Sequence, residues 1–366
     1  SPILNLLLAL FVGIATGAGI LVSQYFGAKE RDHLANVIGN CMTLTLLASV
    51  IIMVVGLLVT RPLLVMLNTP ASILDWCTDY LNIFFLGIVG FAAYNILSGV
   101  LRGLGDSLSA LVFLIVATVL NIGLDLWFVA GLHMGVAGVA LATVIAQAIS
   151  AVLCCLKLFR MHDVFTLRAA HLRPMRQYVG KIIRLGVPSG VTQAIFSMAM
   201  LVVQSLTNSF GEAVIACNVI VMRVDGFAMM PNFTFGQAMT TFTGQNVGAG
   251  KPERVRAGAK QGTLMALACA VALTLCILLF GRSLMSIFTS TASLVELSYH
   301  MMSILAAGYI AMAVTQSLSG VMRGAGDTMT PMWISIITTV VLRVPIAYGL
   351  AFLTRSPEYP VGRPES

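Results

Sequence analysis

Charged side chains are scarce in this sequence. Of its 366 residues, 58% are hydrophobic and only 10% are aspartate, glutamate, lysine or arginine, whereas a water-soluble domain carries roughly 25% charged residues. So few charges cannot cover the surface of a protein of this size in water. The lipid bilayer must therefore be the solvent for most of the chain, which excludes a water-soluble enzyme or binding module.

Several patterns that carry chemistry are also missing. The seven cysteines are scattered through apolar segments, without a Cys-x-x-Cys pair or a histidine at ligand spacing, so no resident metal or other cofactor is expected. No Gly-Lys-Ser or Gly-Lys-Thr follows a glycine-rich stretch, which excludes a phosphate-binding P-loop. A nucleophile–base pair is not evident either, and we do not expect an enzyme.

Long apolar runs take the place of these patterns. A helix needs about 20 apolar residues to cross the hydrocarbon core, and ten segments are long enough. They are 2–24, 35–60, 76–101, 108–130, 136–160, 182–208, 213–243, 258–281, 293–322 and 329–353. None shows the ten-residue alternation of a membrane strand, and a helix satisfies its own backbone hydrogen bonds in lipid. The sequence predicts an all-α integral membrane protein with about ten transmembrane helices.

The positive charges gather on alternate loops. Of the 21 lysines and arginines, fifteen fall in one set of loops, four in the opposite set, and two, Arg223 and Arg343, inside predicted spans. Cytoplasmic loops carry such an excess, so the larger set marks the cytoplasmic side. This placement accounts for the net charge of +7 without a nucleic-acid partner. We expect a multi-pass monomer in the lipid bilayer of the bacterial inner membrane.

Two segments recur at an offset of 221 residues. Residues 97–106 read Leu-Ser-Gly-Val-Leu-Arg-Gly-Leu-Gly-Asp, and residues 318–327 read Leu-Ser-Gly-Val-Met-Arg-Gly-Ala-Gly-Asp. The same offset carries Gln24, Gly27 and Ala28 onto Gln245, Gly248 and Ala249. Separate matches at one offset indicate an internal duplication.

The offset also predicts how the chain is organised. Applied to every span, it gives six helices per repeat, with the first and last helices falling outside this chain. An even number gives both repeats the same orientation, so two lobes are related by a pseudo-two-fold axis along the membrane normal. The predicted parts are an N-lobe over 1–160, a cytoplasmic linker over 161–181, a C-lobe over 182–353 and an extracellular tail over 354–366.

The repeated motifs resemble those of a transporter family. Its second-helix motif is similar to the pattern Gly13, Gly17, Ala18, Gly19, Gln24, Gly27 and Ala28. The counterpart in the second half is similar to Met-Met-Pro-Asn, Gly-Gln-Ala, Gly-Gln-Asn and Gly-Ala between 229 and 249, and the Arg-Gly-x-Gly-Asp turns at 102–106 and 323–327 resemble those that end the family's fourth and tenth helices. The family is MATE (multidrug and toxic compound extrusion), and the DinF-like branch is the more similar one. The resemblance implies that the family's second to eleventh helices are present.

Acidic residues inside the spans are the first candidates for transport chemistry. Asp125 lies within 108–130, where a carboxylate is costly and usually belongs to an ion pathway or a proton relay. Asn121 lies one turn away on the same face. The MATE resemblance implies that this Asn–Asp pair lines a cation site in the N-lobe. The structural alternative is a carboxyl that neighbouring hydroxyls and amides satisfy.

Asp225 is the second acidic candidate, and it has basic neighbours. Arg223 lies close to it in sequence, and Arg343 is predicted at a similar depth, so a structural ion pair or triad is the alternative to a transport role. Three uncharged residues inside spans complete the candidate cation- and substrate-binding set, with interhelical hydrogen bonding as their alternative role. These are Asn95, Gln193 and Gln204.

Together the observations and the resemblance predict a secondary active antiporter. It would export small organic cations across the cell membrane in exchange for H⁺ or Na⁺, which serves as a coupling ion. The alternative is a flippase for lipid-linked oligosaccharides or precursors with a similar two-lobed fold. Such a flippase is expected to place several cationic residues in its cavity, and only Arg223 and Arg343 are available inside the spans.

Overall fold

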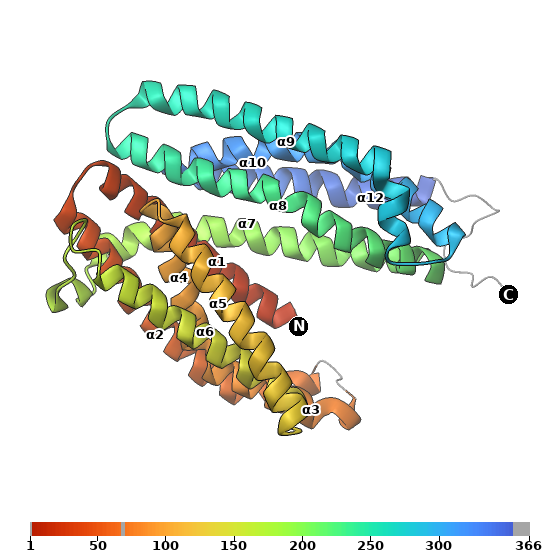
Figure 1. Ribbon diagram of the computed structural model, residues 1–366, viewed down its shortest axis with the longest axis horizontal. Coiled ribbons are helices and arrows are strands. Elements are labelled where there is room, and N and C mark those ends of the chain that lie inside the picture. The colour runs from red at the N-terminus through yellow and green to blue at the C-terminus, as the bar shows by residue number, and fades with distance from the viewer. Residues whose placement is uncertain (1, 67–69, 354–366) are drawn as a thin grey trace. The chain divides into compact units, whose positions relative to one another are not determined.

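The computed structural model describes residues 2–66 and 70–353, and every regular element in these ranges is a helix (Figure 1). The helices are, in chain order, α1 (Pro2–Gly27), α2 (Arg31–Met66), α3 (Ala71–Leu86), α4 (Ile88–Gly103), α5 (Ser107–Asp125), η1 (Leu126–Gly131), α6 (Gly135–Phe159), η2 (Ala169–Leu172), α7 (Arg176–Asn208), α8 (Glu212–Gly248), α9 (Pro252–Ser286), α10 (Ala292–Gly324), α11 (Met329–Ser335), η3 (Ile336–Arg343) and α12 (Val344–Leu353). The predicted all-α fold class is confirmed. The tail predicted over 354–366 lies outside the described residues.

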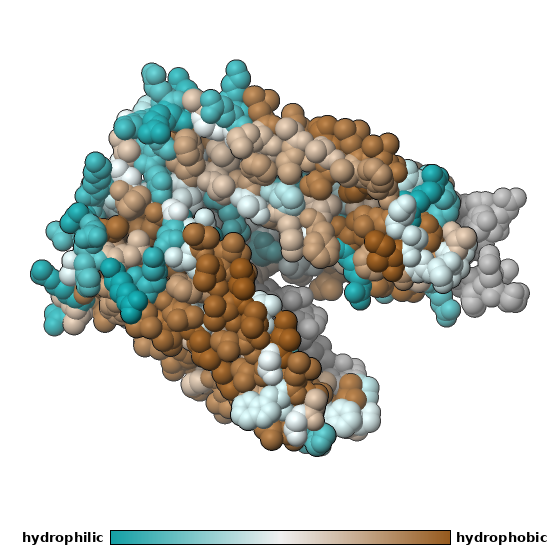
Figure 2. Space-filling view, in the orientation of Figure 1, coloured by the Kyte–Doolittle hydropathy of each residue, from teal (hydrophilic) through white to brown (hydrophobic). Residues whose placement is uncertain are grey.

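The helices have the lengths and surfaces of membrane spans. In the described ranges nine are long and apolar enough to cross a bilayer, or ten if one bent pair is counted as a single span. Large apolar side chains point outward, and Leu58, Phe227 and Leu279 are 73%, 73% and 74% exposed. Figure 2 shows hydrophobic residues along the lengths of the helices and hydrophilic residues gathered near their ends. Such surfaces are stable against lipid and not against water.

The bent pair corrects one predicted span. The sequence predicts a single helix over 76–101, but α3 and α4 meet at Gly87 with a bend of 50°. A Cβ at Gly87 would collide with the side chain of Val144 on α6. Only glycine therefore lets the bent backbone lie this close to α6, and hydropathy does not report such a contact.

Two short segments depart from α-helical geometry. η1 follows Asp125 directly, and η3 lies between α11 and α12; both are π-helical. The sequence predicts continuous helices over 108–130 and 329–353. π-helical turns are rare and often mark functional positions, so the one at Asp125 is relevant to the site.

The close contacts of the chain form two compact units. The first unit is Leu10–Gly190, and the second contains the chain from Val191 onward together with the start of α1. The first half of α7 and the segment before it therefore belong to the first unit. The predicted N-lobe, linker and C-lobe stay predictions.

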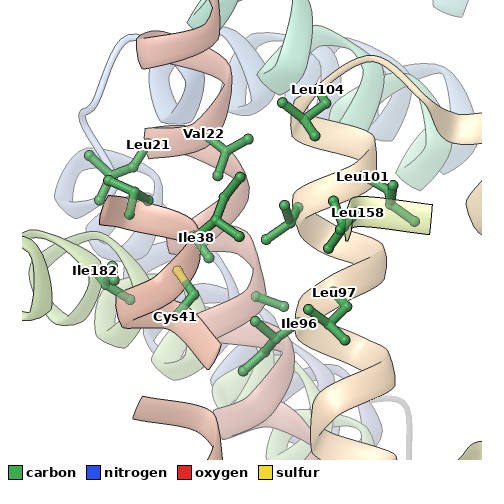
Figure 3. Packing of buried hydrophobic residues seen from close by; sticks show 14 of the residues in the cluster. Leu21, Val22, Ile38, Cys41, Ile96, Leu97, Leu101, Leu104, Leu158 and Ile182 are labelled. Atoms are coloured by element: carbon green, nitrogen blue, oxygen red, sulfur yellow. The ribbon is translucent and has the colours of Figure 1, made fainter. Parts of the chain in front are cut away.

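A cluster of apolar side chains forms the core of the first unit (Figure 3). Val22 on α1, Ile38 on α2, Leu101 on α4, Leu158 on α6 and Ile182 on α7 meet there, each at most 3% exposed. Because lipid tails are as apolar as leucine, the dense packing of these side chains, rather than exclusion of water, stabilises the contact between the helices.

Close backbone contacts recur at the repeat offset. In the first unit, a Cβ built on Gly99 would lie 2.9 Å from the carbonyl oxygen of Ala15, and one on Gly103 would lie 2.7 Å from that of Gly19. In the second unit, Gly320 meets the Gly236 carbonyl and Gly324 meets the Thr240 carbonyl. Each of these four residues lies 221 positions beyond its counterpart in the first unit. The duplication therefore extends to packing: α4 lies on α1 as α10 lies on α8.

The segment between α6 and α7 is fastened to α2. Asn40 is fully buried, and its Oδ1 accepts a 2.7 Å hydrogen bond from the backbone N–H of Met175. The hydroxyl of Thr43 donates to the carbonyl of Leu172 at 2.6 Å. Part of the predicted linker is thus a docked strap and belongs to the first unit.

Both Arg-Gly-x-Gly-Asp turns end in an aspartate that caps the next helix. Asp106 accepts hydrogen bonds from the backbone N–H of Ser109 at 3.0 Å and from its hydroxyl at 2.7 Å, and lies 3.4 Å from Lys157. Asp327 accepts a 3.0 Å hydrogen bond from the backbone N–H of Thr330. Partial burial acts to raise the pKa of Asp106, but the Ser109 hydrogen bonds and the Lys157 charge outweigh it and hold that pKa below its usual value. These turns are structural caps.

The glycine contacts predict that adding one methyl group destabilises the fold at a packed glycine but not at an unpacked one. Gly320→Ala should lower the free energy of unfolding by about 1–3 kcal/mol, because its Cβ would overlap the Gly236 carbonyl. Gly308→Ala is the matched control on α10, since nothing lies within 4 Å of its Cβ position. Thermal unfolding in detergent measures both, and equal midpoints for the two variants would contradict this account of the packing.

The Asp106 cap predicts a pH-dependent stability difference. Folding lowers the pKa of Asp106, so its ionised carboxylate stabilises the fold at any pH above the ordinary aspartate pKa of about 4. This stabilisation is lost as the pH falls through the lowered pKa of the folded state. Asp106→Asn should cost less than about 1 kcal/mol at neutral pH, because asparagine can still cap the helix and only the charge is lost, and the gap to wild type should close on acidification. Asp163→Asn, at an exposed loop position, is the control; a gap that stays constant with pH would be incompatible with the assigned cap.

Candidate functional site

Polar side chains lie between α5 and α6 in the first unit. The amide nitrogen of Asn121 donates to the hydroxyl of Thr143 at 3.3 Å, and the hydroxyl of Ser150 donates to the carbonyl of Phe113 at 3.0 Å. These two bonds set the antiparallel register of the helices. Asp125 follows Asn121 by four residues and lies one turn further along the same face of α5. We call Asn121, Asp125, Thr143 and their neighbours on these two faces the α5–α6 seam.

Asp125 is the acidic residue of this seam. Its Oδ1 is buried and accepts no hydrogen bond from the described residues. Within the same ranges, no lysine, arginine or histidine pairs with the carboxylate. A buried carboxylate oxygen without a donor is costly, and a bound cation or proton would remove that cost. The geometry is therefore suited to reversible ion binding.

The third candidate of the first unit is not joined to this pair. The amide nitrogen of Asn95 donates to the carbonyl of Phe91, one turn back on α4, at 2.8 Å. This local bond uses one donor of the Asn95 side chain and leaves its amide oxygen for another partner.

Asp225 on α8 has a tyrosine partner. The hydroxyl of Tyr309 on α10, a residue only 2% exposed, donates to its Oδ1 at 2.7 Å. Asn232 donates to the backbone carbonyl of Tyr309 at 3.2 Å. Asn218, Asp225 and Asn232 are seven residues apart and share one face of α8. Asp225 and Asn232 link α8 to α10, whereas Asn218 bonds to α7.

The ion pair considered for Asp225 is not found. In the described part of the chain, neither Arg223 nor Arg343 forms a salt bridge with it. Arg223 is two residues away, which turns it about 200° around the helix, and it is exposed. Arg343 lies in the π-helical η3 and donates to the sulfur of Met200 at 3.8 Å. Closeness in sequence for Arg223, and a similar depth in the membrane for Arg343, therefore did not place either arginine on the helix face that Asp225 occupies.

The two glutamines on α7 have different surroundings. Gln204 donates to Asn208 at 2.8 Å and accepts from Asn218 of α8 at 2.9 Å, so it makes the interhelical hydrogen bonds named as its alternative role. Gln193 lies on the exposed side of α7. The candidate residues therefore form separate groups in the two units.

Three polar residues of these groups were not singled out from the sequence. Thr143 and Gln147 lie on α6, and Tyr309 lies on α10. Thr143 and Gln147 are uncharged polar residues inside a predicted span, the signal that identified Asn95. Tyr309 gave no such signal, because an aromatic residue in an apolar helix is ordinary.

Comparisons with known proteins agree with this fold. The MatE family model matches residues 1–127 and 188–349. The probable multidrug resistance protein YoeA of Bacillus subtilis (strain 168) is 28% identical over 362 residues, covering 97% of this chain and 78% of that protein. The probable multidrug resistance protein YpnP of the same strain is 30% identical over 345 residues, covering 94% of this chain and 77% of that protein.

Solved structures show the same fold. A crystal structure of MATE in the bent conformation has a TM-score of 0.90 at 23% identity, covering 97% of this chain and 79% of that chain. A MOP superfamily transporter from Pyrococcus furiosus Vc1 (DSM3638) has a TM-score of 0.88 at 23% identity, covering 96% and 79%.

The family match spans most of the chain. Its break at 128–187 contains most of η1, all of α6, the segment that follows and the start of α7, and the residues after 349 also lie outside the match. Membership of the DinF-like branch stays a prediction. The repeated glycine contacts, the apolar helices and the family match lead to one conclusion: the chain belongs to the MatE family of multi-pass cell-membrane transporters and is not an enzyme.

Proposed function

We propose that the protein is a secondary active antiporter that exports small organic cations, drugs among them, in exchange for H⁺ or Na⁺. The observation that carries this proposal is the Asp125 carboxylate, with a buried oxygen that has no partner among the described residues. The names of the relatives, which are probable multidrug resistance proteins, agree with drug export. The protein is proposed to work as a monomer.

Charge compensation gives the exchange its physical basis. A carboxylate held away from water is stabilised by a bound cation or by protonation. When the coupling ion occupies Asp125, the site is neutral and attracts no cationic substrate. When the ion leaves, the carboxylate regains its charge and draws a cation toward the first unit. Ion and substrate therefore compete for one negative charge, which couples their opposite movements.

Asn121 and the helix geometry support this role. The Asn121 amide is held by Thr143 at 3.3 Å, which orients its oxygen one turn from Asp125. The π-helical η1 begins at the next residue, Leu126. Hydrogen bonds in a π segment can shift to α-helical partners, so the backbone after Asp125 can adjust as an ion arrives or leaves.

Asp225, Asn95, Gln193, Gln204, Arg223 and Arg343 stay predicted cation- or substrate-binding residues. The flippase alternative gains no specific support from them. Arg223 and Arg343, the cations that it would need, are separated in sequence and make no ion pair within the described ranges.

The proposal predicts that Asp125→Asn abolishes export. The amide is isosteric with the carboxylate but carries no charge, so it neither takes up the coupling ion nor attracts the substrate. The measurement uses the full chain in proteoliposomes loaded with a fluorescent organic cation, with Na⁺ and pH gradients imposed separately. We expect background export from the variant at normal protein levels, and partial export from Asp125→Glu.

Asp79→Asn provides the control, because Asp79 is an exposed acid in the middle of α3. Its export should match that of wild type. Wild-type rates from Asp125→Asn would remove Asp125 from the mechanism. Lipid translocation by the wild type without dye export under either gradient would favour the flippase.

A further inference from the structure

Gln147 on α6 has a buried oxygen that the proposed exchange does not use. Its Oε1 is buried and accepts no hydrogen bond within the described ranges, as for Oδ1 of Asp125. An unpaired buried amide oxygen costs about 1–3 kcal/mol. In a helix that crosses lipid, such a group calls for an explanation in terms of a ligand.

The register of α5 and α6 places Gln147 in the same seam as Asp125. Gln147 follows Thr143 by four residues and precedes Ser150 by three, and both of these hydroxyls bond to α5. The three side chains therefore share the face of α6 that packs on α5. Gln147 lies about 6 Å from Thr143 along the helix axis.

A small residue lies opposite Gln147. The Asn121–Thr143 and Phe113–Ser150 bonds fix the pairing of the two helices, and midway between them Gln147 lies opposite Ala117. Ala117 is 3% exposed and contributes only a methyl group to the seam.

The seam thus presents oxygen atoms in succession along the helices. From the η1 end toward the Lys157 end they belong to Asp125, Asn121, Thr143 and Gln147. Carboxylate, carbonyl and hydroxyl oxygens are the ligands that hard cations take. An amide oxygen ligates a metal cation well, but it is far too weak a base to carry a proton near neutral pH.

We propose that Gln147 is a second station for the coupling ion and that this ion is Na⁺. The inference rests on the proposed function, which it deepens by naming the ion and a further ligand. Na⁺ held at Asp125 would pass along the seam to the Gln147 oxygen on its way toward the Lys157 end. The unpaired amide oxygen of Gln147 would then replace one of the water ligands that the ion loses.

The test measures Na⁺ dependence in variants of the full chain. In proteoliposomes at a clamped pH, the Na⁺ concentration that gives half-maximal dye export should rise about tenfold in Gln147→Leu, which keeps the volume and removes the ligand. Gln147→Asn, with a shorter reach, should be intermediate. Thr118→Val is the matched control, since Thr118 lies at the same depth on α5 but is exposed and bonded to its own helix.

A binding measurement separates this inference from the transport proposal. NaCl should raise the melting temperature of the detergent-solubilised wild type relative to choline chloride at equal ionic strength. This rise should shrink in Gln147→Leu and persist in Thr118→Val. An unchanged Na⁺ dependence in Gln147→Leu, or wild-type export driven equally by a pH gradient without Na⁺, would overturn the inference. Wild-type export from Asp125→Asn would instead count against the proposed function.

Discussion

The close approach of helix backbones at glycine is the constraint on which the structure depends. Association of helices in lipid gains nothing from excluding water, so it relies on packing and on interhelical hydrogen bonds. Gly99 and Gly103 let α4 lie against α1, and Gly320 and Gly324 let α10 lie against α8. At Gly87, where α3 and α4 bend, the missing Cβ leaves room for the side chain of Val144 on α6.

The polar groups occupy the seams that this packing leaves. Between α5 and α6, two hydrogen bonds hold the helices in register, and an acid and an amide retain unpaired oxygens. Between α8 and α10, the acid has its donor, Tyr309. The two carboxylates therefore differ: Asp225 accepts a hydrogen bond that helps to join two helices, whereas Asp125 has a buried oxygen without a partner among the described residues.

The sequence predicted the fold well, because span length, charge placement and the 221-residue offset are properties of composition and order. It also singled out Asp125 and Asn121 as candidates, since an acid in lipid is conspicuous and a four-residue spacing defines a helix face. The bend at Gly87 and the π-helical turns were missed, because each depends on local contacts that hydropathy does not register. The ion pair considered as an alternative for Asp225 is not found among the described residues, and Gln147 was not singled out from the sequence. Both have one cause: the rotation of each helix and its register with the next decide which polar groups meet.

The duplicated packing has an evolutionary consequence. Adding 221 to Asn121 and Asp125 leads to Leu342 and Ile346, and subtracting 221 from Asp225 leads to Leu4. The architecture of the ancestral half was thus inherited twice, while the acids stand alone in their respective copies. Because the packing is duplicated but the acids occupy non-equivalent positions, each acid can be substituted without a matching change at the equivalent position of the other half.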